Sequence, residues 1–391
     1  MDSGLNARLR LARGAVLVVF FVHGAVFASW AARIPAVQER LVLSPGLLGI
    51  VLAGPALGAL AGSQAGGRLV DVVGSRAISA LAPVILCLPL GLIPLASSPW
   101  QLTGLLLALG AADGTTAVAM NAQAVAVQDR YGRPVLNGMH AGRSIGAVIG
   151  GLGGAAMVLG GLPLSAQFPL SAAVLAVISA LAAGWLLPSR RRTLTSPSRS
   201  KHGNWFAVGL LALLTFLAAL VEDAPASWGG VYLRSIGAAG SVAAAGYGVF
   251  SAGEVVGRLY SDRLVARVGW TRLIRAGTLA CALAFTAALL LGRVEVTLVA
   301  LAVAGLGIST VFPGAFAGAG SIRNVDGGVA MAQVNFAGNV GWLAVSPTIG
   351  GLATISSLPL ALGLLPAAAL AIAALASATE PEGAADRPNS S

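Results

Sequence analysis

The chain is a succession of long apolar runs separated by short stretches that carry charged residues, glycine or proline. A helix needs about 20 consecutive apolar residues to cross the hydrocarbon core of a bilayer. Measured against that length, the pattern predicts an all-α integral membrane protein with twelve transmembrane helices. The predicted spans are residues 14–34, 46–66, 77–96, 101–127, 138–160, 166–187, 205–226, 238–260, 272–292, 296–318, 329–351 and 357–377.

The composition supports a chain that faces lipid. Of the 391 residues, 57% are hydrophobic and 10% are charged, and the mean hydropathy is +0.85. A soluble protein has about 25% charged residues, so the polar residues here are too few to cover a water-facing surface. The two cysteines, Cys87 and Cys281, lie inside apolar runs, which argues against a disulfide framework.

Polar composition also marks the predicted domain boundaries. Residues 188–204 form a basic, serine-rich stretch, which predicts a cytoplasmic linker between two six-helix halves, residues 1–187 and 205–379. Residues 380–391 are polar, with proline and glycine, and predict a disordered tail.

The basic residues predict the orientation of the chain. The net charge of +10 is spread between apolar runs and forms no aromatic-interleaved patch, which argues against nucleic-acid binding. With the N-terminus inside, nineteen of the 24 Lys and Arg residues fall on the cytoplasmic side and four outside, with Arg143 in a span. The first apolar run is longer than that of a signal peptide. We therefore expect an uncleaved first helix and cytoplasmic termini.

Two charged stretches repeat at about half the length of the chain. GGRLVDVVGSR covers residues 66–76, and GRLYSDRLVARVGWTR covers residues 257–272. Aligned on Gly-Arg-Leu, Arg68 corresponds to Arg258, and an acidic residue follows in each copy. A repeat at this spacing indicates a duplicated membrane protein.

The first copy resembles the loop between helices 2 and 3 of major facilitator superfamily (MFS) transporters, whose pattern is G-x-L-x-D-x-x-G-R. Residues 29–54, 120–151, 227–233 and 244–264 resemble the YbjJ-like branch of that superfamily, which is loosely related to the fucose permease type. The resemblance implies the MFS fold, with 3+3 inverted repeats in each half. It also implies a central cavity lined by the first, fourth, seventh and tenth helices.

The same resemblance implies a gating role for the repeated loop. The residues concerned are Gly67, Arg68, Asp71, Gly74 and Arg76 in the first copy and Arg258 and Asp262 in the second. Asp71 and Arg76 could pair, and a carboxylate there could contact a helix N-terminus in one transport state only. The alternative is a topological anchor whose arginines merely stay in the cytoplasm.

Charged residues inside the predicted spans are costly and indicate functional sites by default. Asp113 lies near the middle of the fourth span, and Asn121 lies about 80° around the helix from it. Glu222 lies near the outer end of the seventh span. We predict Asp113 and Glu222 as the proton-coupling residues. A structural hydrogen bond between helices is the alternative role for Asp113.

Two further charges are weaker candidates. Glu254, in the eighth span, is singled out only as an intramembrane acid. Arg143, near the start of the fifth span, has two possible roles: its side chain could extend to the cytoplasmic interface, or it could bind an anionic group in the cavity.

Aromatic and amide side chains complete the predicted solute site. His23, Phe27 and Trp30 share one face of the first helix, which suits a small polar organic solute. His23 could instead carry a proton or bond to a backbone carbonyl in a helix contact. Shared faces are also predicted for Asn335 with Asn339, and for Ser309 with Phe312 and Phe316. The predicted substrate-binding set is His23, Phe27, Trp30, Asp113, Asn121, Glu222, Asn335 and Asn339.

The sequence contains no phosphate-binding G-x-x-x-x-G-K-[ST] motif and no metal-ligand cluster. We therefore predict no enzyme activity and no cofactor. The prediction is secondary active, proton-coupled transport of a small polar organic solute across the bacterial inner membrane, by alternating access and by a monomer. Facilitated diffusion and multidrug or metabolite export stay open. From another class, a non-transporting sensor or scaffold would need a signalling domain.

Overall fold

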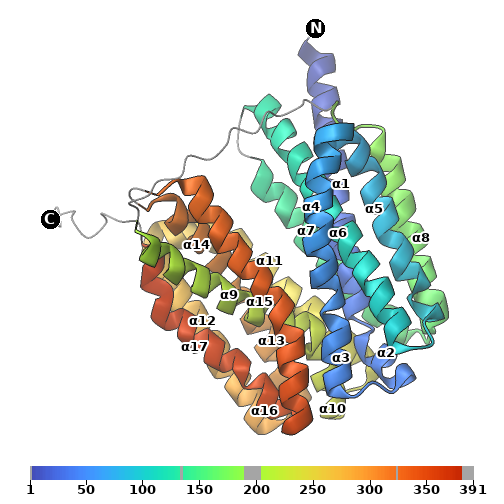
Figure 1. The fold of residues 1–391 in the computed structure, drawn as a ribbon, viewed down its shortest axis with the longest axis vertical. Helices are drawn as coiled ribbons and strands as arrows, with labels where there is room; N and C mark the ends of the chain where they lie inside the picture. Colours follow the sequence, from blue (N-terminus) through green and yellow to red (C-terminus); the bar gives the residue numbers. More distant parts are fainter. Residues whose placement is uncertain (1, 133–134, 189–203, 323–324, 381–391) are drawn as a thin grey trace, which may run out of the picture. The chain divides into compact units, whose positions relative to one another are not determined.

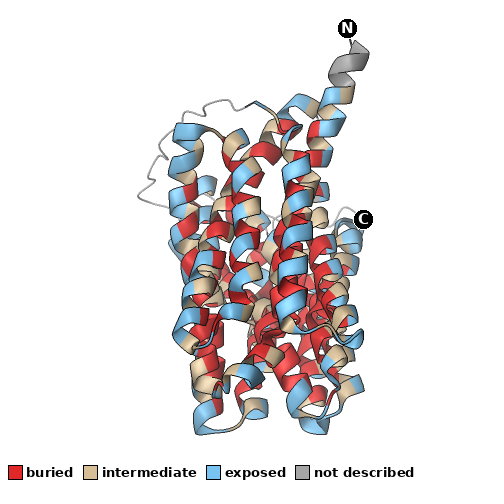
Figure 2. Cartoon of the chain, turned by 90° about the vertical axis from the view of Figure 1, so that its right-hand side faces the viewer, coloured by how far each residue is buried: buried red, intermediate tan, exposed pale blue. Residues whose placement is uncertain are grey.

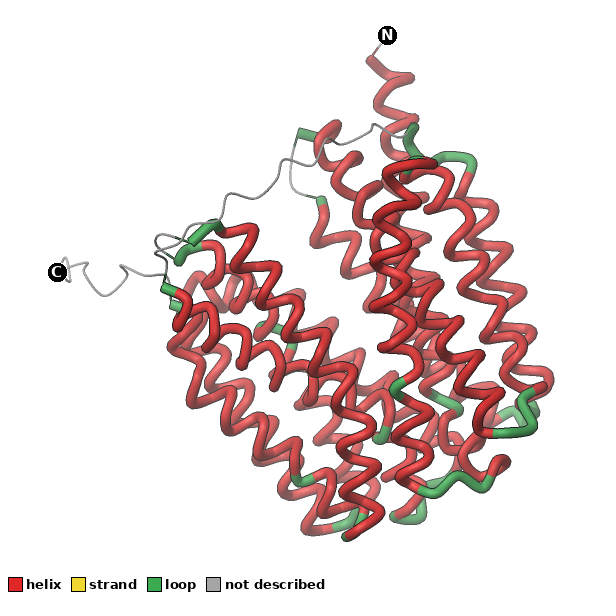
Figure 3. The backbone as a smooth tube through the Cα atoms, viewed as in Figure 1, coloured by secondary structure: helices red, strands yellow, loops and turns green. Residues whose placement is uncertain are grey.

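The structure is a computed structural model, and it describes residues 2–132, 135–188, 204–322 and 325–380. Across these residues the chain folds into helices joined by short loops, with no strand (Figure 3). Most of the predicted linker, 188–204, and of the predicted tail, 380–391, lies outside the described residues.

The helices follow one another closely along the chain and are labelled in Figure 1. Their bounds are α1 Asp2–Ala31, α2 Ile34–Leu41, α3 Pro45–Leu52, α4 Gly54–Val73, α5 Ser75–Leu92, η1 Ile93–Leu95, α6 Pro99–Tyr131, α7 Leu136–Leu159, α8 Leu164–Ala183, α9 Trp205–Ser227, α10 Gly229–Ser235, α11 Gly240–Val268, α12 Trp270–Leu291, α13 Val294–Ile308, α14 Val311–Gly320, α15 Gly327–Ile355, α16 Leu358–Leu362, α17 Leu364–Leu375 and η2 Ala376–Thr379.

The predicted all-α membrane fold is confirmed. Ten stretches of the described chain are long and apolar enough to cross a membrane. The other two predicted spans correspond to α11 and α15, each 29 residues long. Three crossings are built from two helices in sequence, α3 with α4, α13 with α14, and α16 with α17. Short α2 and α10 follow the first and seventh crossings.

Exposed apolar side chains show which faces are suited to lipid. On α5, Leu81, Ile85, Leu88 and Leu92 are exposed and recur every three or four residues, so they form one stripe. In water such a stripe would be an unfavourable apolar patch. Figure 2 shows the same division, with buried residues and exposed residues on opposite faces of many helices.

The chain divides into two compact units. Unit 1 comprises Met1–Thr193 and Ala226–Ala252, and unit 2 comprises Leu194–Pro225 and Gly253–Ser391. The predicted halves instead place residues 226–252 with the second half. Unit 1 includes this segment because α10 and the first turns of α11 pack on its helices.

The contacts of segment 226–252 within unit 1 are close. Arg234 of α10 donates from Nε to Oε1 of Glu39 on α2, at 2.9 Å. On α11, Gly248 lies against α7, since a Cβ on Gly151 would come within 2.9 Å of the Gly248 Cα. These glycines allow the two helices to approach at backbone distance.

Glycines also set the closest helix crossings inside unit 1. A Cβ at Gly110 of α6 would lie 2.0 Å from the carbonyl oxygen of Pro55 on α4. A Cβ at Gly146 of α7 would lie 2.0 Å from the carbonyl oxygen of Phe21 on α1. Backbone atoms cannot rotate away as a side chain can, so these positions require glycine.

Unit 2 uses the same packing with different residues. Gly277 of α12 and Gly307 of α13 face each other so closely that a Cβ on Gly307 would lie 2.3 Å from the Gly277 carbonyl oxygen. The hydroxyl of Thr215 on α9 donates to the carbonyl oxygen of Val334 on α15, at 2.8 Å. Such hydrogen bonds join helices where no water is present to compete.

The structure also sets the register of the sequence repeat. A glycine follows the last residue of α4 and of α11: Gly74 and Gly269, with φ of +101° and +79°, and the next helix begins at the following residue in each case. A positive φ is suited to glycine. Aligned on these glycines, RLV at 68–70 matches RLV at 263–265.

The alignment on these glycines shifts the second copy of the repeat by five residues relative to the alignment on Gly-Arg-Leu. The counterpart of Arg68 is Arg263, and Arg258 and Asp262 lie inside α11. The predicted loop is likewise mostly helical in the first copy, because nothing before Gly74 interrupts the helix.

Candidate functional site

A buried histidine and an aspartate meet inside unit 1. Nε2 of His23 on α1 lies 2.9 Å from Oδ1 of Asp113 on α6, and the two side chains are 9% and 24% exposed. The contact does not have the geometry of an aligned hydrogen bond, and it is an ion pair only in the state with a protonated imidazole. Two groups that can each hold a proton therefore lie within transfer distance in an apolar environment.

The aromatic residues predicted on the same face of α1 diverge. The ring of Phe27 meets Tyr247 edge-on, with centroids 5.9 Å apart. Trp30 is 1% exposed and packs on Phe168 of α8, at 6.3 Å. Phe27 is thus near His23 in the chain and only partly buried, whereas Trp30 belongs to the packed interior of unit 1.

The polar residues farther along α6 have different roles. Asn121 is partly exposed, and its Nδ2 donates to the carbonyl oxygen of Ala117, one turn back, at 2.8 Å. Oε1 of Gln128 accepts from the backbone N–H groups of Val135 and Leu136, at 3.0 and 3.2 Å. Gln128 therefore satisfies donors at the start of α7, and Asn121 is the better candidate for a solute.

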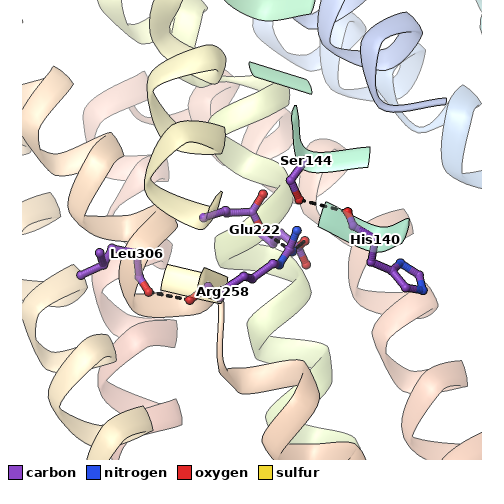
Figure 4. A network of polar contacts seen from close by, with 7 residues as sticks. His140, Ser144, Glu222, Arg258 and Leu306 are labelled. Atoms are coloured by element: carbon purple, nitrogen blue, oxygen red, sulfur yellow. Dashed lines mark hydrogen bonds and ion pairs between the residues drawn. The ribbon is translucent and has the colours of Figure 1, made fainter. Parts of the chain in front are cut away.

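Unit 2 holds a cluster of two acids and one arginine. Nη2 of Arg258 lies 2.7 Å from Oε1 of Glu254 and 3.8 Å from Oε1 of Glu222. In Figure 4 the side chains of Glu222 and Arg258 point toward each other. The carboxyl groups are mostly buried, at 15% exposure for Glu222 and 5% for Glu254. A buried acid of this kind requires such a partner.

Sequence reasoning identified both acids but not their arginine. Alignment on Gly-Arg-Leu places Arg258 in the repeated loop and so separates it from these acids. The spacing of Glu254 and Arg258, four residues apart on one helix, is the signal that could have indicated the pair.

A half-buried group of three aromatic rings lies elsewhere in unit 2. Phe312 of α14 stacks on Trp342 of α15, with centroids 5.5 Å apart and planes at 21°, and lies 6.3 Å from Phe316. Asn339 is partly exposed and Asn335 is exposed, both on α15. Trp342 was not predicted, although it follows Asn335 and Asn339 at helical spacing.

The residues expected to form a gate lie at the end of α4 and the start of α5. Arg68 and Asp71 are exposed, and no ion pair joins Asp71 to any residue within the described ranges. Arg76 donates to the carbonyl oxygen of Gly184, at 3.5 Å, after the end of α8. Gly67 lies in open space on α4.

Arg143 lies in the second turn of α7 and is partly exposed. Its backbone contacts α1 closely, since a Cβ on Gly24 would come within 2.0 Å of the Arg143 carbonyl oxygen.

Comparison with known proteins places this architecture in a family. The model of the Major Facilitator Superfamily matches residues 15–345. The chain belongs to the major facilitator superfamily. Among its relatives, an uncharacterized MFS-type transporter of Yersinia pestis is 32% identical over 368 residues, covering 92% of this chain and 94% of the relative. Membrane protein MosC of Rhizobium meliloti is 29% identical, covering 89% and 85%.

Solved structures of the superfamily share the fold. The nucleoside transporter NupG matches with a TM-score of 0.72 and 14% identity, over 94% of this chain and 98% of NupG. A D-xylose–proton symporter matches with a TM-score of 0.75 and 14% identity, over 95% and 98%. At this identity the likeness establishes the MFS fold. Together with the family match, it identifies the protein as a multi-pass membrane transporter.

Proposed function

We propose that this MFS protein carries a small polar organic solute across the bacterial inner membrane by alternating access, coupled to protons. The contact between His23 and Asp113 carries this proposal. Buried charges in a membrane protein are rare and mark ion pathways and proton relays, and an imidazole titrates close to physiological pH. A relay of this kind gives the transporter a way to draw on a proton gradient.

Glu222 is the second proposed coupling residue. Its guanidinium partner, Arg258, lies closer to Glu254 than to Glu222. Protonation of Glu222 would leave Arg258 paired with Glu254, so no buried charge would lose its last partner. This arrangement supports Glu222, and not Glu254, as the acid that loads and releases a proton.

The proposed solute contacts combine rings and hydrogen-bonding groups. They are His23, Phe27, Asp113 and Asn121 of unit 1 and Glu222, Asn335 and Asn339 of unit 2. Trp30 is left out because its ring is buried against Phe168. Among structural neighbours, one printed title names a nucleoside transporter and another a D-xylose–proton symporter. Both titles agree with a polar organic solute.

The experiment begins with thermal-shift screening of the purified protein against small polar metabolites. Each stabilising compound is then offered, radiolabelled, to proteoliposomes with an inside-alkaline pH gradient. We expect accumulation that a protonophore abolishes. Uptake that ignores the gradient would establish facilitated diffusion in place of coupling. If no stabilising compound enters the vesicles, solute transport of this class is wrong.

Orientation is testable with reporter fusions. We propose that both termini face the cytoplasm, because the basic residues favour that side. A reporter that is active only in the periplasm should stay silent when fused after residue 380, and a cytoplasmic reporter should be active there. The opposite pattern would invert the map of the twelve crossings.

Asp71→Asn tests the proposed gate. We expect uptake to fall several-fold with an unchanged thermal midpoint, because an exposed carboxylate contributes little to folding and its role lies in one transport state. The matched control is Asp262→Asn, since the glycine register gives Asp262 no equivalence to Asp71. Normal uptake by Asp71→Asn would assign Asp71 a merely topological role. An equal loss of uptake in Asp262→Asn would show that the effect is not specific to Asp71, and would also contradict the proposed gate.

A further inference from the structure

The side-chain amide of Gln167 is buried in unit 1 with both of its polar atoms unsatisfied in the part of the chain that the structure describes. Gln167 lies in the first turn of α8 and is 0% exposed. Neither Oε1 nor Nε2 has a hydrogen-bond partner among the described residues. Exchanging the two atoms by rotating the amide does not help, because both positions lack a partner. Buried polar groups of native proteins nearly always have one, so this amide is suited to contact a bound species.

A buried guanidinium lies at the same corner of the fold. Arg33, between α1 and α2, is 7% exposed and donates from Nη2 to the carbonyl oxygen of Leu162. Its Nε has no partner, and it forms no ion pair with any described carboxylate. Burial lowers the pKa of the Arg33 guanidinium. A buried charge without a counter-charge is costly.

Two contacts bring these groups together. A Cβ on Gly154 would lie 2.9 Å from the Cβ of Ala32 and 3.3 Å from Nε2 of Gln167, which places the amide beside the residue that precedes Arg33. The acceptor of Arg33, Leu162, lies two residues before α8 begins. Arg33 and Gln167 therefore lie near the positive end of the α8 dipole.

We infer that the corner formed by Arg33 and Gln167 binds one small monovalent anion of the size of chloride. An anion accepts hydrogen bonds from Nε of Arg33 and Nε2 of Gln167, and its charge neutralises the guanidinium. The positive end of the α8 dipole stabilises the anion further. A water molecule would satisfy the amide but would leave the charge uncompensated. Trp30 and Phe168, close in the chain to Arg33 and Gln167, are buried against each other, so the surroundings are packed and a small ion is favoured.

This site is separate from the proposed transport residues. None of Arg33, Gln167 and Leu162 belongs to the proposed solute or proton set. The inferred role is to hold the end of α1 and the start of α8 together. Chloride should therefore stabilise the folded protein whether or not a solute is transported.

The direct test is crystallisation of the full chain from sodium bromide with data collected at the bromine absorption edge. We expect one anomalous peak within hydrogen-bond distance of Arg33 Nε and Gln167 Nε2. A peak without anomalous signal would mean that a water occupies the corner, and no peak would mean that it is dry. Either result overturns the inference.

The second test is thermal stability of the purified protein in sodium chloride against sodium gluconate at equal ionic strength. At a chloride concentration ten times the Kd, we expect a midpoint on the order of 3 °C higher. Arg33→Gln and Gln167→Leu should each remove this shift, and Arg234→Gln, at an exposed arginine of unit 1, should keep it. An equal shift in all four proteins would place the chloride effect elsewhere and overturn the inference.

Discussion

Asp113→Asn should abolish solute accumulation driven by a pH gradient. A gradient of one pH unit lets a transporter that moves one proton per solute concentrate its solute about tenfold. Asparagine has nearly the shape of aspartate but cannot take up a proton, so the ratio in the variant should fall to about one. Exchange of labelled for unlabelled solute at equal pH should persist, because exchange needs no net proton movement. The measurement is the inside-to-outside solute ratio in proteoliposomes.

The matched control is Asp129→Asn. Asp129 lies on the same helix, α6, but is exposed near its end. It should behave as the parent protein does. His23→Gln should also impair accumulation, because it removes the partner that lies 2.9 Å from the Asp113 carboxylate. If Asp113→Asn still concentrates solute tenfold, the contact between His23 and Asp113 is a structural link between α1 and α6.

Gly110→Val should prevent stable folding. The Cβ of any residue at position 110 would lie 2.0 Å from the carbonyl oxygen of Pro55, so α4 and α6 would have to move apart along their whole contact. Overpacking of a close contact costs about 1–3 kcal/mol and occasionally more. A clash with backbone belongs at the upper end of that range. We expect loss of the monodisperse peak in detergent, or a thermal midpoint lower by about 10 °C.

Gly104→Val separates crowding from the helical cost of replacing glycine. Gly104 lies on the same helix, and a Cβ there meets nothing within 4 Å. Both variants place a β-branched residue in α6, but only Gly110→Val places it against another backbone. Similar thermal midpoints for the two variants would show that α4 and α6 tolerate separation, and that the contact does not determine the stability of unit 1.

The crossing helices could be predicted because their signal is local. A run of about 20 apolar residues has few alternatives in a chain with so little charge. The crossings α11 and α15 are also predicted from the sequence, because each is one uninterrupted helix of 29 residues with few charges in its first 18 residues. The short helices α2 and α10 were not, because eight or seven residues between two spans carry no periodicity that separates a helix from a loop.

The candidate site was predictable residue by residue but not in its pairings. The sequence singles out Asp113 by its charge inside an apolar run, and His23 by the face that it shares with two aromatic residues. That they meet depends on how α1 packs against α6, which no spacing within either helix encodes. The same limit applies to Trp30, whose position on α1 suggested a shared face with His23, whereas its ring packs on α8.

The repeat shows a different limit. Gly-Arg-Leu occurs in both copies and offered an alignment, but a short motif can recur by chance along an arginine-rich helix. The backbone distinguishes the two possible registers, because each helix is followed directly by a glycine with positive φ, Gly74 in one copy and Gly269 in the other. In this register Asp71 is matched by Ala266, so the acid is present in one copy only.

Segment 226–252 limits where the gene could be divided. Two helices are each shared between the compact units: α9 belongs to unit 2 up to Pro225 and to unit 1 after it, and α11 belongs to unit 1 up to Ala252 and to unit 2 from Gly253. A break in the basic stretch 188–204 would give two polypeptides of six crossings each, but the second would carry away residues that complete the first. Complementation by two separately expressed pieces would therefore depend on their reassembly and not on two autonomous folding units.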